Sequence, residues 1–297
     1  MVNKELTLKN DVIFKEFFSK EGNEKYLQDF LTGLLEINIT KIEIQRDVSL
    51  ERLSEEEKLG VLDIQAVVDN KTIISIEMQM YYDKSIIKRS GFYSAKKRSS
   101  DAKKGDKYSN LRDIIMVNIL NFNINPYEEY LSQGITVLKE HREYELETGI
   151  SYYYIELPKF RKIKPDMEKK LEQWLVFIDN KERGLIEMAK EKNEVIKEAE
   201  KELEYLTGDE EVKRMAFLHE KWEMDYNSGV ENAREDGIQQ GIQRGRKEGE
   251  KIGQERGERI GEKKKAKEIA KKMLKQKIDI QIIIDVTGLT KEEIEKF

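Results

Sequence analysis

The sequence contains no cysteine and only two histidines, His141 and His219. Without cysteine the chain forms no disulfide, no thiolate metal site and no cysteine nucleophile. Two histidines leave little material for a multi-histidine zinc site or a serine–histidine triad, and they are most simply surface or packing residues. A metal ion bound by this chain would therefore have oxygen ligands, which suit Mg²⁺, Mn²⁺ or Ca²⁺.

Long apolar runs are missing as well. No run approaches the roughly 20 residues that a membrane-spanning helix needs, and residues 1–5 lack the basic-then-apolar pattern of a signal peptide. We therefore expect a cytoplasmic protein with no membrane partner. Basic residues number 54 and acidic residues 59, for a formal net charge of −5. This balance excludes a globally basic nucleic-acid binder but allows a local basic patch.

Apolar and charged residues each make up 38% of the 297 residues, so the core must be concentrated in part of the chain. The spacing of apolar residues predicts both helices and strands. We expect helices over 7–35, 83–104, 167–178 and 185–205, and strands over 39–50, 111–122, 135–144 and 151–157.

The clearest local signal is a β-hairpin over 61–80. Apolar and polar residues alternate on both sides of a turn at Asn70-Lys71, so residues should pair where their numbers add up to 140. One face of the hairpin then carries the core residues Leu62, Ile64, Ala66, Val68, Ile74, Ile76, Met78 and Met80. The other face carries Asp63, Gln65, Ser75, Glu77 and Gln79.

This register places Asp63 directly opposite Glu77, with Cβ atoms about 5 Å apart. Two opposed carboxylates are destabilising unless something compensates them. A divalent cation such as Mg²⁺ is the obvious compensator, with Mn²⁺ as a substitute. The alternative is a solvent-exposed sheet face whose acidic residues only make it soluble.

The segments Leu62-Asp63-Ile64 and Ile76-Glu77-Met78-Gln79 resemble the active-site hairpin of the PD-(D/E)xK nuclease superfamily. They are most similar to its Rpn-type family of recombination-promoting nucleases and transposases. The order and spacing of further segments along nearly the whole chain support this resemblance: 10–18, Arg89 with Tyr93, Gly105 with Tyr108, 155–160, and 286–290.

The resemblance implies an α/β fold with a restriction-endonuclease-like core, in which helices flank a mixed central sheet, plus a helical C-terminal extension. The nuclease-like core would cover 1–160. It would be followed by a helical extension over 161–228, a Gly-periodic charged arm over 229–265 and a small helical module over 266–297.

The same resemblance implies a Mg²⁺-dependent DNA endonuclease linked to recombination or transposition, in which Asp63 and Glu77 hold the metal ion. Asp11 matches an acidic position that the family places near this site, and Lys15 follows one turn later. The alternative for Asp11 and Lys15 is a surface i,i+4 ion pair.

Gln79 stands where the superfamily usually has a lysine. Its amide could orient the attacking water, but positive charge would have to come from Lys15 or Arg89. Catalysis could therefore be weak. The alternative function is a catalytically silent DNA-binding or oligomerising protein that keeps the fold.

Ten basic residues lie between positions 84 and 112, opposed only by Asp101 and Asp106. Such a cluster next to a phosphodiesterase site is expected to follow the DNA backbone and to give affinity rather than sequence readout. The predicted DNA-binding residues are Lys88, Arg89, Tyr93, Lys96, Lys97 and Arg98. The alternative is an ordinary solvated helix face.

From Gly229 to Gly261 a small residue recurs at every fourth position. Seven interior glycines would cost a helix on the order of 7 kcal/mol, so the arm is either a tether or partly helical arm, or a self-association face. The last thirty residues resemble a helix-turn-helix in outline, with a turn at Gly288 and a capping box at Thr290 and Glu293. Three-helix packing or dimerisation explains them equally well. We expect a homodimer through this C-terminal region.

Overall fold

The computed structural model describes residues 6–45, 64–105 and 107–297. The chain forms two compact units, residues 1–222 and 223–297. Helix α8 (Glu210–Lys275) contributes residues to both units.

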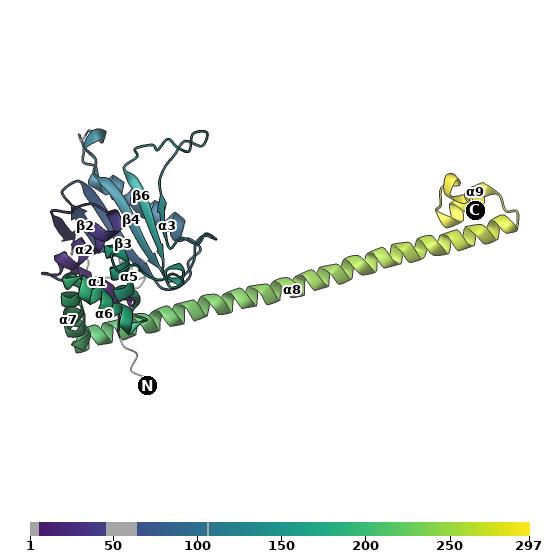
Figure 1. The fold of residues 1–297 in the computed structure, drawn as a ribbon. Helices are drawn as coiled ribbons and strands as arrows, with labels where there is room; N and C mark the ends of the chain where they lie inside the picture. The colour runs from purple at the N-terminus through teal and green to yellow at the C-terminus, as the bar shows by residue number, and fades with distance from the viewer. Residues whose placement is uncertain (1–5, 46–63, 106) are drawn as a thin grey trace. The chain divides into compact units, whose positions relative to one another are not determined.

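A six-stranded mixed sheet is the centre of the first unit (Figure 1). Its order is β1-β2-β3-β4-β6-β5, and β3, β4 and β6 run parallel while the other neighbours pair antiparallel. The strands are β1 (Ile42–Gln45), β2 (Ile64–Val68), β3 (Thr72–Gln79), β4 (Asp113–Leu120), β5 (Leu131–Gly134) and β6 (Ile150–Glu156). This mixed sheet with helices around it confirms the predicted fold class.

The predicted hairpin register is confirmed for the described residues of β2 and β3. Ile64 pairs with Ile76 and Val68 pairs with Thr72, so the residue numbers add up to 140 as expected. Asp69 and Asn70 turn the chain with φ values of 49° and 58°, a left-handed conformation that these two residue types tolerate. Asp69 is also fixed by Thr40, whose hydroxyl donates to its carboxylate over 2.7 Å.

One face of this sheet packs on the main hydrophobic core. The helices α1 (Asp11–Ser19), α2 (Glu24–Leu35) and α5 (Lys170–Asp179) cover that face and bury Phe18, Phe30 and Trp174 completely. The indole Nε1 of Trp174 donates to Asp29 over 2.9 Å, so its one polar atom is satisfied. The described residues of the predicted core face lie here: Ile64, Ala66, Val68, Ile74, Ile76 and Met78, with Met80 partly buried. Leu62, the remaining residue predicted for this face, lies outside the described residues.

Helix α3 (Ile86–Asp101) lies against the opposite face (Figure 1). There Ser90 donates to the buried Asn118 of β4. A smaller apolar cluster forms on this face from Val67, Ile73, Ile114 and Met116, with Tyr93 of α3 packed against it. The face that carries Gln65, Ser75, Glu77 and Gln79 is therefore covered by a helix rather than open to solvent.

Asp101, at the end of α3, is hydrogen-bonded to Arg112, the residue before β4. Its carboxylate accepts from Arg112 Nε over 2.8 Å and also from Arg112 Nη2, and its side chain is only 7% exposed. The Arg112 hydrogen bonds hold the pKa of Asp101 below its usual value. The carboxylate therefore stays ionised and keeps Arg112 in place.

We expect Asp101→Asn to lower the free energy of unfolding by about 1–2 kcal/mol near neutral pH, because a charged hydrogen-bond pair is lost. The folded-state pKa is lowered, so the wild-type advantage is complete above the unfolded pKa of about 4 and is lost as the pH falls through the folded value. Urea denaturation of both proteins near neutral pH and at about pH 3 tests this. An advantage of the same size at both pH values would contradict it.

The boundaries of several predicted elements were wrong. The helix expected over 7–35 is two helices, separated by residues 20–23 with Gly22 at φ 90°. The helix expected over 185–205 breaks at Asn193, which ends α6 (Arg183–Lys192) and caps α7 (Glu194–Gly208). Asn193 also donates to Asp29 and Gln173, and these long-range bonds fix the break. The strand expected over 135–144 was wrong, since only Val137 forms a single bridge there, to Glu145.

The second unit consists of the rest of α8, α9 (Ile280–Thr287) and α10 (Lys291–Ile294). The Gly-periodic segment is continuous helix. Ala270, Ile283, Leu289 and Ile294 form a small core at the end of the chain. The predicted helix stop at Gly288 and the capping box of Thr290 and Glu293 are both confirmed. Within the described residues, no helix is long and apolar enough to cross a membrane.

Candidate active site

Glu77 and Gln79 lie near the end of β3, on the face covered by α3, and both contact Arg89 of that helix. Arg89 Nη2 donates to Glu77 Oε1 and, over 2.6 Å, to Gln79 Oε1. The side chains of Glu77 and Arg89 are 20% and 23% exposed, so the group remains accessible from solvent. Glu77 and Gln79, both predicted from the sequence as site residues, are thus bound by the same guanidinium, that of Arg89.

The start of α3 holds Arg89 in this position. Asp83 precedes the helix, and its carboxylate accepts from both the backbone N–H and the hydroxyl of Ser85 over 2.7 Å. The same carboxylate lies 3.0 Å from Arg89 Nη1. The guanidinium is therefore held between Asp83 on one side and Glu77 with Gln79 on the other, a fork geometry that a lysine could not reproduce.

A row of polar groups continues from Glu77 across the sheet. The strand register places Glu77 beside Asn118 of β4 and Asn118 beside Tyr154 of β6. Asn118 is 1% exposed, accepts from Ser90 Oγ over 2.9 Å and donates to a backbone carbonyl. Burial raises the pKa of Tyr154, which keeps its phenol neutral.

Three residues of this site were not predicted from the sequence: Asn118, Ser90 and Asp83. Asn118 is the one that a sequence signal could have revealed, because it interrupts the apolar run Ile-Ile-Met-Val-Asn-Ile-Leu of a strand predicted to be buried. A buried polar side chain needs hydrogen-bond partners, so an asparagine there indicates a polar neighbour on the covering helix.

The motif 155–160 forms a buried polar cluster at the end of β6. Glu156 and Lys159 are 0% and 4% exposed and form an ion pair over 2.7 Å. Glu156 also accepts from Asn125 and from the backbone N–H of Ile124, both over 2.8 Å. These bonds fix the segment that follows β4, at the same edge of the sheet as Gln79.

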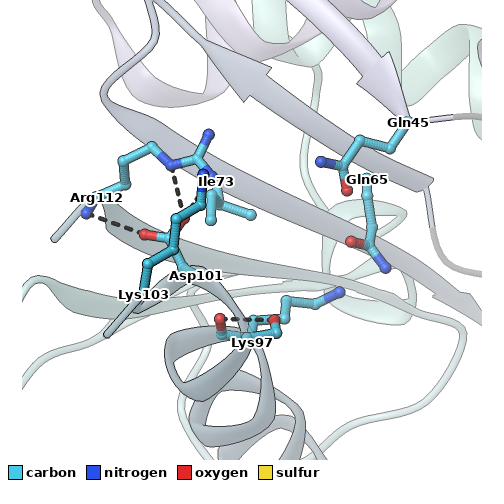
Figure 2. Close-up of a pocket in the computed structure, with 8 residues that line it drawn as sticks. Gln45, Gln65, Ile73, Lys97, Asp101, Lys103 and Arg112 are labelled. Carbon is cyan, nitrogen blue, oxygen red and sulfur yellow. Dashed lines mark hydrogen bonds and ion pairs between the residues drawn. The ribbon is translucent and has the colours of Figure 1, made fainter. Parts of the chain in front are cut away.

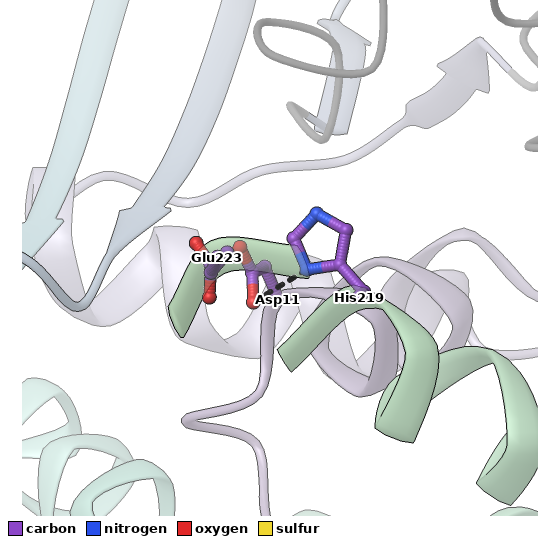
Figure 3. Close-up of side chains that lie close together, drawn as sticks. All are labelled: Asp11, His219 and Glu223. Atoms are coloured by element: carbon purple, nitrogen blue, oxygen red, sulfur yellow. Dashed lines mark ion pairs between the residues drawn. The ribbon is translucent and has the colours of Figure 1, made fainter. Parts of the chain in front are cut away.

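Asp11 and Lys15 lie on α1, which packs against the main core rather than on the α3 face. Asp11 Oδ1 lies 3.7 Å from His219 Nδ1, and the two side chains face each other (Figure 3). Lys15 is 8% exposed. Neither residue is a solvated surface group.

Asp63 lies outside the described residues, so its predicted place opposite Glu77 stays a prediction. The oxygen atoms that are described fit a hard divalent cation: a carboxylate on Glu77 and an amide carbonyl on Gln79, both already turned toward one positive charge. If such an ion is bound, Glu77 would hold it together with Asp63, the second ligand that the family resemblance implies.

The predicted DNA-binding residues occupy different environments on α3. Lys88 and Lys96 are exposed, and Lys97 is partly buried. Tyr93 packs against the small apolar cluster. Arg98 donates to the backbone carbonyls of Arg112, Thr148 and Gly149 over 2.7 to 3.1 Å, so its guanidinium ties α3 to two neighbouring segments.

Comparison with known families gives two matches. The model of a family described as "PD-(D/E)XK nuclease family transposase" matches residues 8–233. The model described as "Rpn/YhgA-like nuclease family, C-terminal HTH domain" matches residues 263–297. No curated protein and no solved structure shows significant similarity to the chain.

Proposed function

Because this chain belongs to the PD-(D/E)XK nuclease family of transposases, we propose that it is a Mg²⁺-dependent DNA endonuclease acting in recombination or transposition. The observation that supports this most directly is the meeting of Glu77, Gln79 and Arg89 at the end of β3. A nuclease needs a carboxylate for the metal ion, a group that orients water and positive charge beside the phosphate.

Each residue then has a defined task. Glu77 and Asp63 would hold the metal ion, which lowers the pKa of a bound water and polarises the phosphate when present. The Gln79 amide orients the attacking water, because it offers both a donor and an acceptor. Arg89 stabilises the negative charge that builds up on the phosphate oxygens during attack. Asp11 and Lys15 stay candidates on the basis of the family resemblance.

DNA would be bound by two separate parts of the chain. Lys88, Lys96 and Lys97 would contact the backbone beside the active site, adding charge-dependent affinity. The C-terminal helix-turn-helix match supports a second contact, and its surface is rich in lysine. Helix-turn-helix units of this kind place their second helix in the major groove.

The direct test is cleavage of supercoiled plasmid by purified protein with Mg²⁺, with Mn²⁺ and with EDTA. We expect nicked or linear product with either metal ion and none with EDTA. If DNA is bound but never cut with any divalent cation, the chain is instead a silent DNA-binding protein. The missing lysine at Gln79 is the feature that favours this alternative.

The proposed homodimer has support in the second unit. Ile238, Ile242, Ile252 and Ile260 are 49–70% exposed, and helical geometry puts all four on one side of α8. A helix with seven interior glycines loses on the order of 7 kcal/mol, so burial of this isoleucine stripe against a second copy would offset part of that cost.

We expect the full-length protein to be dimeric and a chain ending at Asn227 to be monomeric by light scattering. The shortened chain should keep nicking activity but lose most double-strand cutting, since one metal site cuts one strand. The full-length double variant Ile242→Glu, Ile260→Glu keeps the helix-turn-helix and should also be monomeric. A shortened chain that remains dimeric would place the interface elsewhere.

A further inference from the structure

A polar pocket of about 160 Å³ lies at the other end of α3 from Arg89 (Figure 2). Ile73 of β3 forms part of its lining, and Gln45 of β1 and Gln65 of β2 lie along one side. The remaining lining residues come from the end of α3 and the segment that follows it: Lys97, Ser100, Asp101, Lys103 and Arg112.

The charges of this pocket suit an anion. Among the lining residues that the structure describes, three are cations (Lys97, Lys103 and Arg112) and one is a carboxylate, that of Asp101, which is bound to Arg112. Gln45 and Gln65 add neutral hydrogen-bond donors. Cations and amide donors are among the groups that contact phosphate oxygens in protein–DNA complexes.

One cation of the pocket, Arg112, is held in a fixed position by its neighbours. Asp101 accepts from the backbone N–H of Arg112 as well as from its guanidinium. Arg98 binds the carbonyl of Arg112 over 2.7 Å, which fixes the backbone at the same residue. An anion at this place would therefore meet a guanidinium that is already held in position.

The position of the pocket relates it to the candidate active site. Gln65 pairs with Ser75, so Gln65, Ile73, Ser75 and Glu77 all share the face beneath α3. From Ile73 to Glu77 is four residues of strand, about 13 Å, and from Arg89 to Lys97 is eight residues of helix, about 12 Å. Both distances are only a few times the rise per nucleotide of a DNA strand, so the pocket and the active site are close enough to contact phosphates of the same strand.

We propose that this pocket binds a backbone phosphate of the DNA strand, a few nucleotides from the phosphodiester at Glu77. The inference rests on the proposed nuclease function and adds a second phosphate contact to the one at the active site. One phosphate at the active site leaves the strand free to pivot, whereas a second phosphate held at Arg112, Lys97 and Lys103 sets its direction along α3.

The test is binding of a fluorescent 20-base-pair duplex by fluorescence anisotropy, in EDTA and at several salt concentrations. The variant Lys97→Gln, Lys103→Gln should bind about tenfold more weakly, with a salt slope reduced by about 1. Gln65→Ala should weaken binding severalfold with an unchanged slope, because it removes a donor but no charge. The control is Lys201→Gln on α7, which packs against α1 and α2 on the other side of the sheet.

The subsite is overturned if the double variant binds like Lys201→Gln, or if Gln65→Ala has no effect, since a diffuse positive field would need no amide. Inorganic phosphate at matched ionic strength should compete only weakly. If calorimetry shows tight phosphate binding that the double variant loses, while DNA binding is unchanged, the pocket takes free phosphate instead. Wild-type protein that neither binds nor cuts DNA would refute the nuclease function itself, and thermal melting shows that each variant is folded.

Discussion

Replacing Glu77 by glutamine should abolish Mg²⁺-dependent cleavage of plasmid DNA, with a loss of at least about a thousandfold. Glutamine has the size of glutamate but no charge, so it is a poor ligand for a hard cation. The Arg89 guanidinium can still donate to the amide oxygen, which preserves the local contacts. The measurement is the initial rate of nicking at saturating Mg²⁺.

The matched control is Glu43→Gln on β1, whose side chain is 56% exposed and pairs with Lys41 at the edge of the sheet. This variant should cleave at the wild-type rate. Duplex binding in EDTA should be unchanged or slightly tighter for Glu77→Gln, because a negative charge near the phosphate is removed. Cleavage by Glu77→Gln at the wild-type rate would refute the assignment of Glu77.

Replacing Arg89 by alanine should reduce cleavage by about 10²–10³-fold, the size of effect seen when one stabilising donor is removed from a transition state. At the same time Mn²⁺ should bind more tightly, because a cation that occupies Glu77 and Gln79 is removed. Arg89→Lys should fall between, since it keeps the charge but lacks the planar guanidinium that spans Asp83 on one side and Glu77 with Gln79 on the other. The measurements are nicking rate and Mn²⁺ affinity by calorimetry.

If Arg89 had only a structural role, Arg89→Ala would lower both the nicking rate and the Mn²⁺ affinity. A lower nicking rate together with a higher Mn²⁺ affinity therefore identifies its function. Gln79→Lys provides a second check. It restores the residue usual in the superfamily, but its ammonium would lie against the Arg89 guanidinium. We expect Gln79→Lys alone to be less active than wild type and Gln79→Lys with Arg89→Met to recover part of the loss.

The alternating pattern of β2 and β3 was sufficient to predict their register and both of their faces. A shift of one residue would have moved Ile64, Ala66 and Ile74 from the core to the α3 side, so the pattern allowed only one pairing. The capping box at Thr290 was equally predictable, because its bonds are local.

Contacts between distant parts of the chain were not predictable in this way. The bridge from Arg89 to Glu77 depends on where α3 lies on the sheet, and no spacing in the sequence gives that position. Likewise, the break at Asn193 depends on bonds to Asp29 and Gln173, more than 160 and about 20 residues away. Local periodicity predicts one longer helix there, but the tertiary hydrogen bonds prevail.

The most direct test of the active-site assignment is the position of a bound metal ion. Crystals of the full-length protein soaked in Mn²⁺ should show an anomalous peak at coordination distance, about 2.1 Å, from the Glu77 carboxylate, with the Arg89 guanidinium displaced from it. The same crystals of Glu77→Gln should show no peak there. A wild-type peak beside Asp11 and His219, with none at Glu77, would contradict the account.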